Sequence, residues 1–215
     1  MHLLSLNIGT PKTENFHGRE VITGLCKLPV LERLPLTKTG FVGDGVQDHK
    51  HHGGEDKAVC VYSAEHYPHW QKVLGQTLPP AAFGENLTVS GLREEKIHLG
   101  DCFRLGTALL QVSQPRQPCK TLAARYGRND FVKLVVDAGS TGFYFRVLEE
   151  GEVGQGDTLA LVTQDPLEVS IAFANRIFHH DRKNRPGVEK VLTVGALSAS
   201  WRDSFQDLLK NCASA

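Results

Sequence analysis

Short apolar runs, separated by glycine, proline and polar residues, fill the first three quarters of the chain. Each run has the length of a strand, and the runs do not alternate regularly with helical segments. This pattern favours an antiparallel, barrel-like β domain over a parallel α/β sheet. The predicted strands cover residues 3–8, 21–28, 57–62, 85–89, 102–105, 109–113, 142–148 and 158–162.

A few segments inside this region carry helical spacing instead. Ser63 is a suitable cap for a helix that places Tyr67, Trp70 and Leu74 on one face. Pro118 is suited to the first turn of a second helix, and residues 131–136 predict a third. The expected fold class is therefore mainly β, a β-barrel with inserted helices.

The pattern changes at Asp165, where a capping residue, Pro166 and Glu168 predict the start of a helix. Residues 164–215 are expected to form a small subdomain of three helices after a β domain over residues 1–163. A helix-turn-helix reader of DNA is the alternative, but this segment has nearly equal numbers of basic and acidic residues. We expect packing on the β domain and no specific nucleic acid binding.

The amino-acid composition excludes several classes of protein. The chain has 215 residues, a formal net charge of +0 and 40% hydrophobic residues, which excludes intrinsic disorder and a global basic surface. No apolar run reaches the length of a membrane span, and no signal-peptide pattern is present, so we expect a cytoplasmic protein without membrane association. The 5 cysteines are scattered without a C-x-x-C pair, which predicts reduced thiols rather than a disulfide framework.

The segment from Gly43 to Lys57 is the most polar and glycine-rich part of the chain. Its glycines allow close approach of the backbone to a ligand, and Lys57 adds a point charge suited to phosphate. A turn-rich hairpin loop is the simpler alternative. A zinc site is a third interpretation, since the region contains several metal-ligand side chains, namely Asp48, His49, His51, His52, His66 and His69.

A second segment runs from a predicted strand into a predicted helix and places Cys119 in the first turn of that helix. The helix start, Arg116 and Lys120 favour the thiolate form of Cys119, which suits either a soft metal or a nucleophile. Cys60 and Cys212 lie in apolar patterns and are expected in the core.

A third segment, residues 83–88, holds a Gly-Glu-Asn turn. Asn86 offers donors and an acceptor for the edge of a heterocycle, and Glu85 could orient its neighbours. The alternative is a turn in which Asn86 bonds its own backbone.

Taken in order, the glycine loop, His52-Gly53-Gly54-x-x-Lys57, Phe83-Gly84-Glu85-Asn86, Gly100-Asp101 and Val112-Ser113-Gln114-Pro115-Arg116-x-Pro118-Cys119 resemble the MOSC-domain family. The helical tail resembles the three-helix segment of its YiiM-like bacterial branch. This resemblance implies a MOSC-type β-barrel that binds the molybdenum cofactor, with Cys119 as the molybdenum ligand. It places His52, Gly53, Gly54 and Lys57 at the phosphate or pterin side, with Asn86 and Arg116 as further pocket candidates.

The resemblance also implies an activity, the reduction of N-hydroxylated substrates such as 6-N-hydroxylaminopurine bases, hydroxylamines and amidoximes to amines. Cys119 and His52 are the predicted catalytic residues, with His52 or His51 as a proton source. No dinucleotide-binding pattern or iron–sulfur cysteine cluster is present in the sequence, so electrons are expected from a separate flavin- or iron–sulfur-type donor protein.

Two alternatives stay open. The fold is also expected to serve as a non-catalytic carrier of the cofactor or of sulfur, with a persulfide on Cys119. The second alternative is an unrelated cysteine hydrolase or zinc enzyme. Association as a homodimer is left open.

Overall fold

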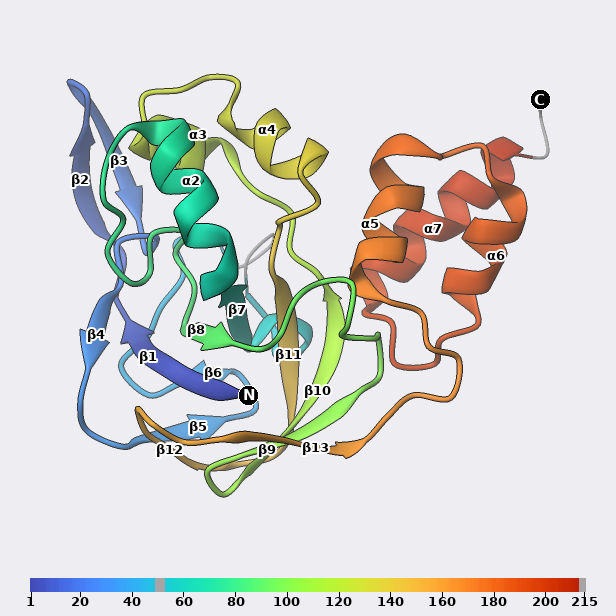
Figure 1. Ribbon diagram of the computed structural model, residues 1–215, viewed down its shortest axis with the longest axis horizontal. Helices are drawn as coiled ribbons and strands as arrows, with labels where there is room; N and C mark the ends of the chain where they lie inside the picture. Colours follow the sequence, from blue (N-terminus) through green and yellow to red (C-terminus); the bar gives the residue numbers. More distant parts are fainter. Residues whose placement is uncertain (49–52, 213–215) are drawn as a thin grey trace.

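A computed structural model describes residues 1–48 and 53–212. Its largest element is an 8-stranded sheet with the order β13-β9-β10-β11-β7-β8-β1-β4 (Figure 1). Neighbouring strands are antiparallel except for β7 and β8, which run parallel. The strand bounds are β1 His2–Ile8, β4 Leu28–Val30, β7 Val59–Ser63, β8 Leu87–Ser90, β9 Cys102–Leu105, β10 Ala108–Pro115, β11 Phe143–Glu149 and β13 Leu159–Thr163.

Two smaller sheets complete the β part of the molecule. One has the order β12-β5-β6, and the other is the hairpin of β2 and β3. The bounds are β2 Lys12–Phe16, β3 Arg19–Thr23, β5 Leu34–Thr37, β6 Gly40–Phe41 and β12 Gly151–Val153. The predicted strand at 21–28 is therefore two strands, β3 and β4, with a turn between them.

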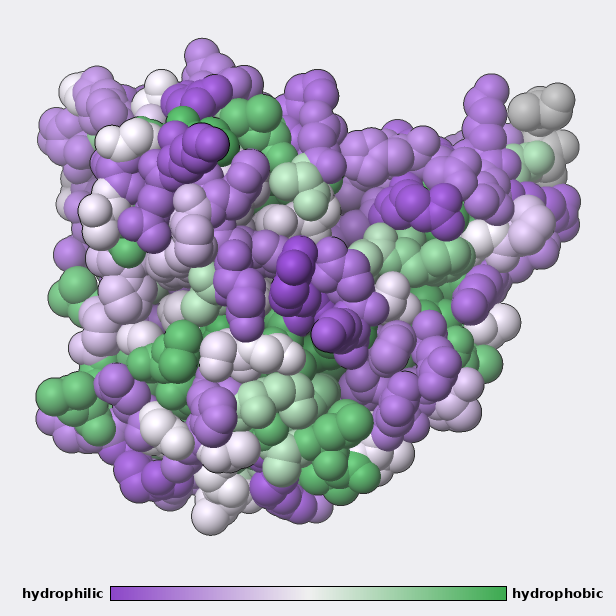
Figure 2. Space-filling view, in the orientation of Figure 1, coloured by the Kyte–Doolittle hydropathy of each residue, from purple (hydrophilic) through white to green (hydrophobic). Residues whose placement is uncertain are grey.

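The predicted β-barrel with inserted helices is confirmed only in part, because the described residues form a large open sheet and no closed barrel. The large sheet curls until the start of β1 lies beside residues 156–159. His2 and Thr158 form an isolated bridge there, and backbone hydrogen bonds join Leu3 to Asp157 at 3.0 Å and Leu159 to Met1 at 3.1 Å. Strands account for 31% of the chain and helices for 28%, so the fold is mixed α/β rather than mainly β. The edge strands carry exposed apolar side chains, Leu28 in β4 and Val162 in β13. Figure 2 shows apolar surface in the lower part of the molecule, where Figure 1 places β13.

Three helices cover an aromatic cluster on one side of the sheet: α2 (Tyr67–Leu74), α3 (Lys120–Arg125) and α4 (Phe131–Asp137). Tyr62 stacks on Phe83 with 4.0 Å between ring centroids. The Tyr62 hydroxyl accepts a hydrogen bond from the Trp70 indole at 2.7 Å and donates to the Ser140 carbonyl at 2.9 Å. The cluster thereby fixes the loop before β8.

The C-terminal segment forms α5 (Ile171–His180), α6 (Arg185–Leu192) and α7 (Ala199–Cys212), which lie beside the sheet in Figure 1. The helix predicted at Asp165 begins later. Asp165 closes a turn by accepting from the Leu167 amide at 3.0 Å, whereas Ser170 caps α5 by accepting from the Phe173 amide at 3.1 Å. None of the helices in residues 1–48 and 53–212 is long and apolar enough to cross a membrane.

Asp56 ties these helices to the rest of the molecule. It lies in the 3-10 helix η1 (Glu55–Lys57), directly after Gly54. Its carboxylate accepts from Arg146 Nε at 3.0 Å, from Arg146 Nη2 at 2.6 Å and from the Ala199 amide at 3.0 Å. The start of α7 is therefore held by the same residue that anchors the end of the glycine-rich loop.

We expect Asp56→Ala to lower the free energy of unfolding by about 2 kcal/mol, because it removes charge-assisted bonds to Arg146 and Ala199. Urea denaturation measures this. Asp137→Ala is the control, since its pair with Lys133 is exposed and should contribute far less. Equal effects of the two substitutions would contradict the role of Asp56.

Stability should also depend on pH through His179 on α5. Burial, with help from His180 and Arg182, lowers the pKa of His179 to about 4. In the unfolded chain the pKa is about 6.5, so the unfolded state binds the proton first as the pH falls. Stability is therefore full above about pH 6.5 and is lost toward pH 4. In His179→Phe, the Tm should depend much less on pH across this range, whereas in His180→Phe most of the pH dependence of the Tm should remain. The same dependence of Tm on pH in both variants would refute the assignment.

Candidate functional site

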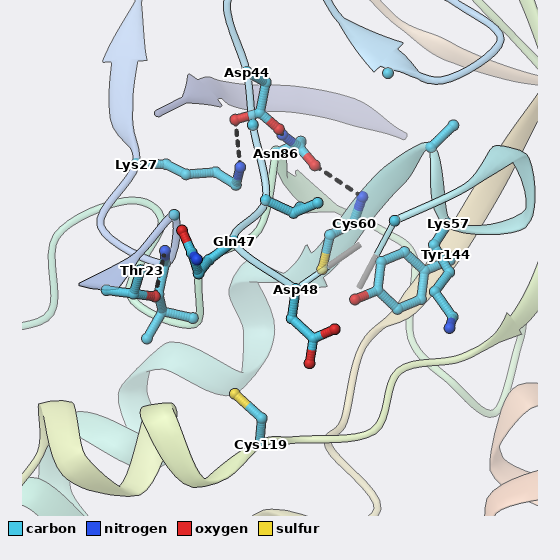
Figure 3. Close-up of a pocket in the computed structure, with 18 of the residues that line it drawn as sticks. Thr23, Lys27, Asp44, Gln47, Asp48, Lys57, Cys60, Asn86, Cys119 and Tyr144 are labelled. Atoms are coloured by element: carbon cyan, nitrogen blue, oxygen red, sulfur yellow. Dashed lines mark hydrogen bonds and ion pairs between the residues drawn. The ribbon is translucent and has the colours of Figure 1, made fainter. Parts of the chain in front are cut away.

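A pocket of about 450 Å³ opens between the glycine-rich loop, strand β7, the loop before β8 and the start of α3. Its volume lies in the range of small-molecule and cofactor sites. Figure 3 shows the side chains converging from these segments. Its polar and reactive lining residues include Lys27, Asp44, Gln47, Asp48, Lys57, Cys60, Asn86, Arg116, Cys119 and Tyr144.

Cys119 lies at the N-cap of α3, one residue before the first helical turn in which the sequence placed it. Its backbone is extended, and its carbonyl accepts from the Leu122 amide at 3.0 Å. Cys119 lines the pocket, and Figure 3 shows its side chain directed into the pocket from the start of α3, below the labelled Asp48. A thiol is thus presented to any molecule that enters.

Arg116 supplies buried positive charge beside this thiol. Only 5% of the residue is exposed, and Nη2 donates to the Phe83 carbonyl at 2.6 Å. Nη1 is buried without an acceptor among the described residues. Burial acts to lower the pKa of Arg116, but interaction with Cys60 and Tyr144 outweighs it, and the pKa lies above the usual value. The guanidinium is therefore charged and has a donor left for a ligand oxygen.

The side-chain amide of Asn86 makes its hydrogen bonds to other residues of the protein. Its Oδ1 accepts from the Cys60 amide at 3.0 Å, and its Nδ2 donates to Asp44 at 2.8 Å and to the Asn7 carbonyl at 3.3 Å. Asp44 in turn pairs with the nearly buried Lys27. Asn86 lines the pocket, and these bonds join neighbouring strands and the glycine-rich loop instead of using its own backbone.

The glycine-rich loop contributes Gly53, Gly54 and Lys57 to the pocket wall. Gly54 has φ 96°, a conformation that favours glycine, and its carbonyl accepts from the Lys57 amide at 2.9 Å. Burial lowers the pKa of Lys57, while Asp56 and Asp48 act against that shift. His52, predicted for catalysis and cofactor binding, lies outside the described residues, as do His49 and His51.

Three further residues line the pocket although the sequence did not predict them as cofactor-binding residues. Cys60 is buried in β7 as expected, yet its side chain borders the pocket, and burial raises its pKa to about 11. Tyr144 lies opposite Cys60 in the register of β7 and β11. Asp48 was noted only as a zinc candidate. The pairing of β7 with β11, which sequence does not reveal, brings the first two together.

The remaining zinc candidates are dispersed. His66 is buried and bonded to Glu94 with 2.7 Å between Nε2 and Oε2, and His69 packs edge-on against Trp70. Across residues 1–48 and 53–212, no three His, Cys, Asp or Glu side chains are grouped as metal ligands. All five cysteines are reduced, as expected.

Comparison with known families agrees with the arrangement of sheet and helices. Residues 48–160 match the MOSC domain, and residues 169–211 match the YiiM-like 3-alpha helix domain. The chain belongs to the MOSC family, and within it to the proteins that carry the YiiM-like helical domain.

Individual relatives cover nearly the whole chain. The uncharacterized protein YflK of Bacillus subtilis is 52% identical over 203 residues, covering 94% of this chain and 92% of YflK. The protein YiiM of Escherichia coli is 35% identical, with 86% and 83% covered. The crystal structure of YiiM from Geobacillus stearothermophilus has a TM-score of 0.82 and 39% identity, with 97% and 98% covered.

A fungal relative is much longer. The protein named "Reductase" in Gibberella moniliformis is 34% identical over 170 residues, which cover 74% of this chain but only 29% of the fungal protein. The chain therefore corresponds to less than a third of that polypeptide.

Asn86→Ala should lower the free energy of unfolding by about 3 kcal/mol, because it leaves buried partners on Cys60, Asn7 and Asp44 unsatisfied. Chemical denaturation measures this loss. Gln47→Ala, in the same pocket wall, should change stability little. If Asn86→Ala were as stable as Gln47→Ala, the hydrogen-bond network would not hold the wall.

Proposed function

We propose that this protein binds the molybdenum cofactor in the pocket and reduces N-hydroxylated compounds to amines. The observation that carries the proposal is the Cys119 thiol projecting into a cofactor-sized cavity beside buried Arg116, whose Nη1 lacks a partner among the described residues. Thiolate is the protein ligand that suits a soft metal centre, and a charged guanidinium suits phosphate or oxo groups.

The residues present fit this group. Cys119 would hold the metal, while Arg116, Lys57 and the backbone at Gly53 and Gly54 would hold the phosphate or pterin side. Gly54 lines the pocket with φ 96°, a conformation that favours glycine. The N–H groups of a glycine turn, together with Lys57, suit an anionic group.

When bound, the cofactor supplies two-electron oxygen-atom transfer chemistry. The overall reaction takes R–NHOH, two electrons and two protons to R–NH2 and water: the N–O bond breaks and the oxygen leaves as water. A separate flavin- or iron–sulfur-type protein is the proposed electron donor. The chain's own task is to orient the N–OH group beside Cys119 and deliver protons, for which His52 stays the predicted source.

The fungal relative supports a redox role, since its name is "Reductase". The alternative, a carrier of cofactor or of a persulfide on Cys119, uses the same sulfur in the pocket and differs only in turnover. Both proposals therefore require binding at Cys119. They are distinguished by whether the protein forms product when electrons are supplied.

The test is to produce the wild type, Cys119→Ala and Cys60→Ala in a host rich in molybdenum cofactor and to measure molybdenum by mass spectrometry and pterin by fluorescence. We expect near-stoichiometric metal in the wild type and a loss of at least about 10-fold in Cys119→Ala. Cys60→Ala is the matched control, because burial keeps that neighbouring sulfur a protonated thiol. Equal molybdenum in Cys119→Ala and wild type would refute Cys119 as the ligand.

Turnover is then assayed with N-hydroxyadenine and a chemical or flavoprotein reductant. Formation of adenine that requires both electrons and molybdenum supports the reductase. Cofactor or persulfide binding with no reduction by any donor supports the carrier, and activity without molybdenum supports neither.

A further inference from the structure

The hairpin of β2 and β3 lies beside the pocket and makes contacts with the rest of the molecule at its base and at its tip. Among the strands of residues 1–48 and 53–212, β2 and β3 pair with each other alone. Figure 1 shows them apart from the large sheet, on the side of α2 and α3. A two-stranded hairpin is marginally stable by itself in water, so the contacts at its ends decide where it lies.

Little of the hairpin itself is buried. Of the 5 residues in each strand, Thr23 alone is buried. Segments with few buried side chains open at a lower free energy than core strands do. The hairpin can therefore move while the large sheet stays folded.

The base of the hairpin borders the pocket and contacts the glycine-rich loop. Residues 22–25, at the end of β3 and just after it, line the pocket, and Ile22 is 57% exposed, which places it at the opening. Gly24 lies so close to the carbonyl oxygen of Gly45 that a Cβ would not fit between them, and a Cβ on Gly45 would lie 2.9 Å from Pro11 Cδ. A movement of the base is therefore transmitted to the glycine-rich loop.

The tip of the hairpin contacts the far end of α3. His17 and Gly18 form its two-residue turn with φ 53° and 85°, the positive values that a type I′ turn requires. His17 Nε2 donates a hydrogen bond to the carbonyl of Arg125 at 3.3 Å. A Cβ on Gly127 would lie 2.9 Å from the same nitrogen, so the imidazole ring rests directly on this glycine.

The short helix α3 connects this tip contact to the reactive thiol, because Cys119 is its N-cap. The hairpin therefore touches two walls of the pocket, the glycine-rich loop at its base and the helix that follows Cys119 at its tip. Arg125 reinforces the connection. Its Nη1 donates to the Leu25 carbonyl at 3.4 Å and to the Ala81 carbonyl at 3.1 Å.

We propose that the β2–β3 hairpin is a strap that closes the pocket over a bound ligand, with His17 as the latch at its tip. While the hydrogen bond to Arg125 holds, a molecule of cofactor size is enclosed. When the tip leaves α3, the hairpin moves about its base and the opening beside Ile22 widens. The inference goes beyond the proposed function, because it concerns how the pocket opens and does not depend on which ligand the pocket holds.

The test measures how fast Cys119 of the ligand-free protein reacts with two thiol reagents, iodoacetamide and the much bulkier fluorescein maleimide. Mass spectrometry of the Cys119 peptide follows the reaction, and Cys102 in β9, outside the residues that line the pocket, is the internal reference. His17→Asn removes the ring but keeps a residue that tolerates a positive φ. We expect it to raise the maleimide rate of Cys119 by about 5-fold, the effect of one lost hydrogen bond, and to leave the iodoacetamide rate unchanged.

Arg19→Ala is the matched control, since Arg19 is an exposed residue of the same hairpin, and it should react like the wild type. Gly127→Ala breaks the latch from the other side, because its Cβ displaces the imidazole ring. It should raise the maleimide rate in the wild type and add little in His17→Asn. The backbone strain at Gly127, with φ 61°, is present in both backgrounds, so this non-additivity isolates the latch.

Hydrogen exchange measured by mass spectrometry gives a second readout. The amides of β2 and β3 should exchange faster in His17→Asn than in Arg19→Ala, whereas those of β10 should not change. Equal maleimide rates for Cys119 in these two variants would overturn the inference. So would an equal acceleration at Cys102, since that result means a loss of overall stability instead of an opening of the strap.

Discussion

The Asp44 carboxylate is the point at which four separate parts of the chain meet. One oxygen accepts from the Gly9 amide at 2.9 Å and pairs with Lys27, and the other accepts from Asn86 at 2.8 Å. These bonds join the end of β1, the segment between β3 and β4, the glycine-rich loop and the loop before β8. Burying a charge is unfavourable unless each oxygen finds partners, so the carboxylate fixes all four segments together. The pocket exists because this junction holds its rim in place.

The local pattern of apolar and polar residues was sufficient to predict most of the helices and strands. The runs at 102–105 and 131–136 became β9 and α4 with little change, because propensity and periodicity agree there. The start of α5 was misplaced because Asp165 and Ser170 both carry capping chemistry, and packing of Ile171 against the core decides between them. Barrel closure depends on how far the sheet curls, which no local pattern encodes.

In the candidate site too, short motifs predicted some residues, whereas others depend on long-range packing. Motif resemblance grouped Cys119, Arg116, Lys57 and the Gly53–Gly54 pair, and the structure brings these around one pocket. The contribution of Cys60 depends on strand register, and that of Asn86 on bonds to residues 26, 42 and 79 positions away. Such long-range pairing is invisible to spacing arguments. The position of the β2–β3 hairpin beside the pocket could not be foreseen either, because it follows from the packing of its tip on α3.

The position of the β2–β3 hairpin along the chain has an evolutionary consequence. The residues proposed to hold the cofactor lie within residues 48–160, which match the MOSC domain, whereas the hairpin precedes them. Selection can therefore alter how readily the pocket opens by changing the hairpin, without disturbing the residues proposed to hold the metal. In such a modular design, the kinetics of ligand exchange and the redox chemistry are inherited on different stretches of the same gene.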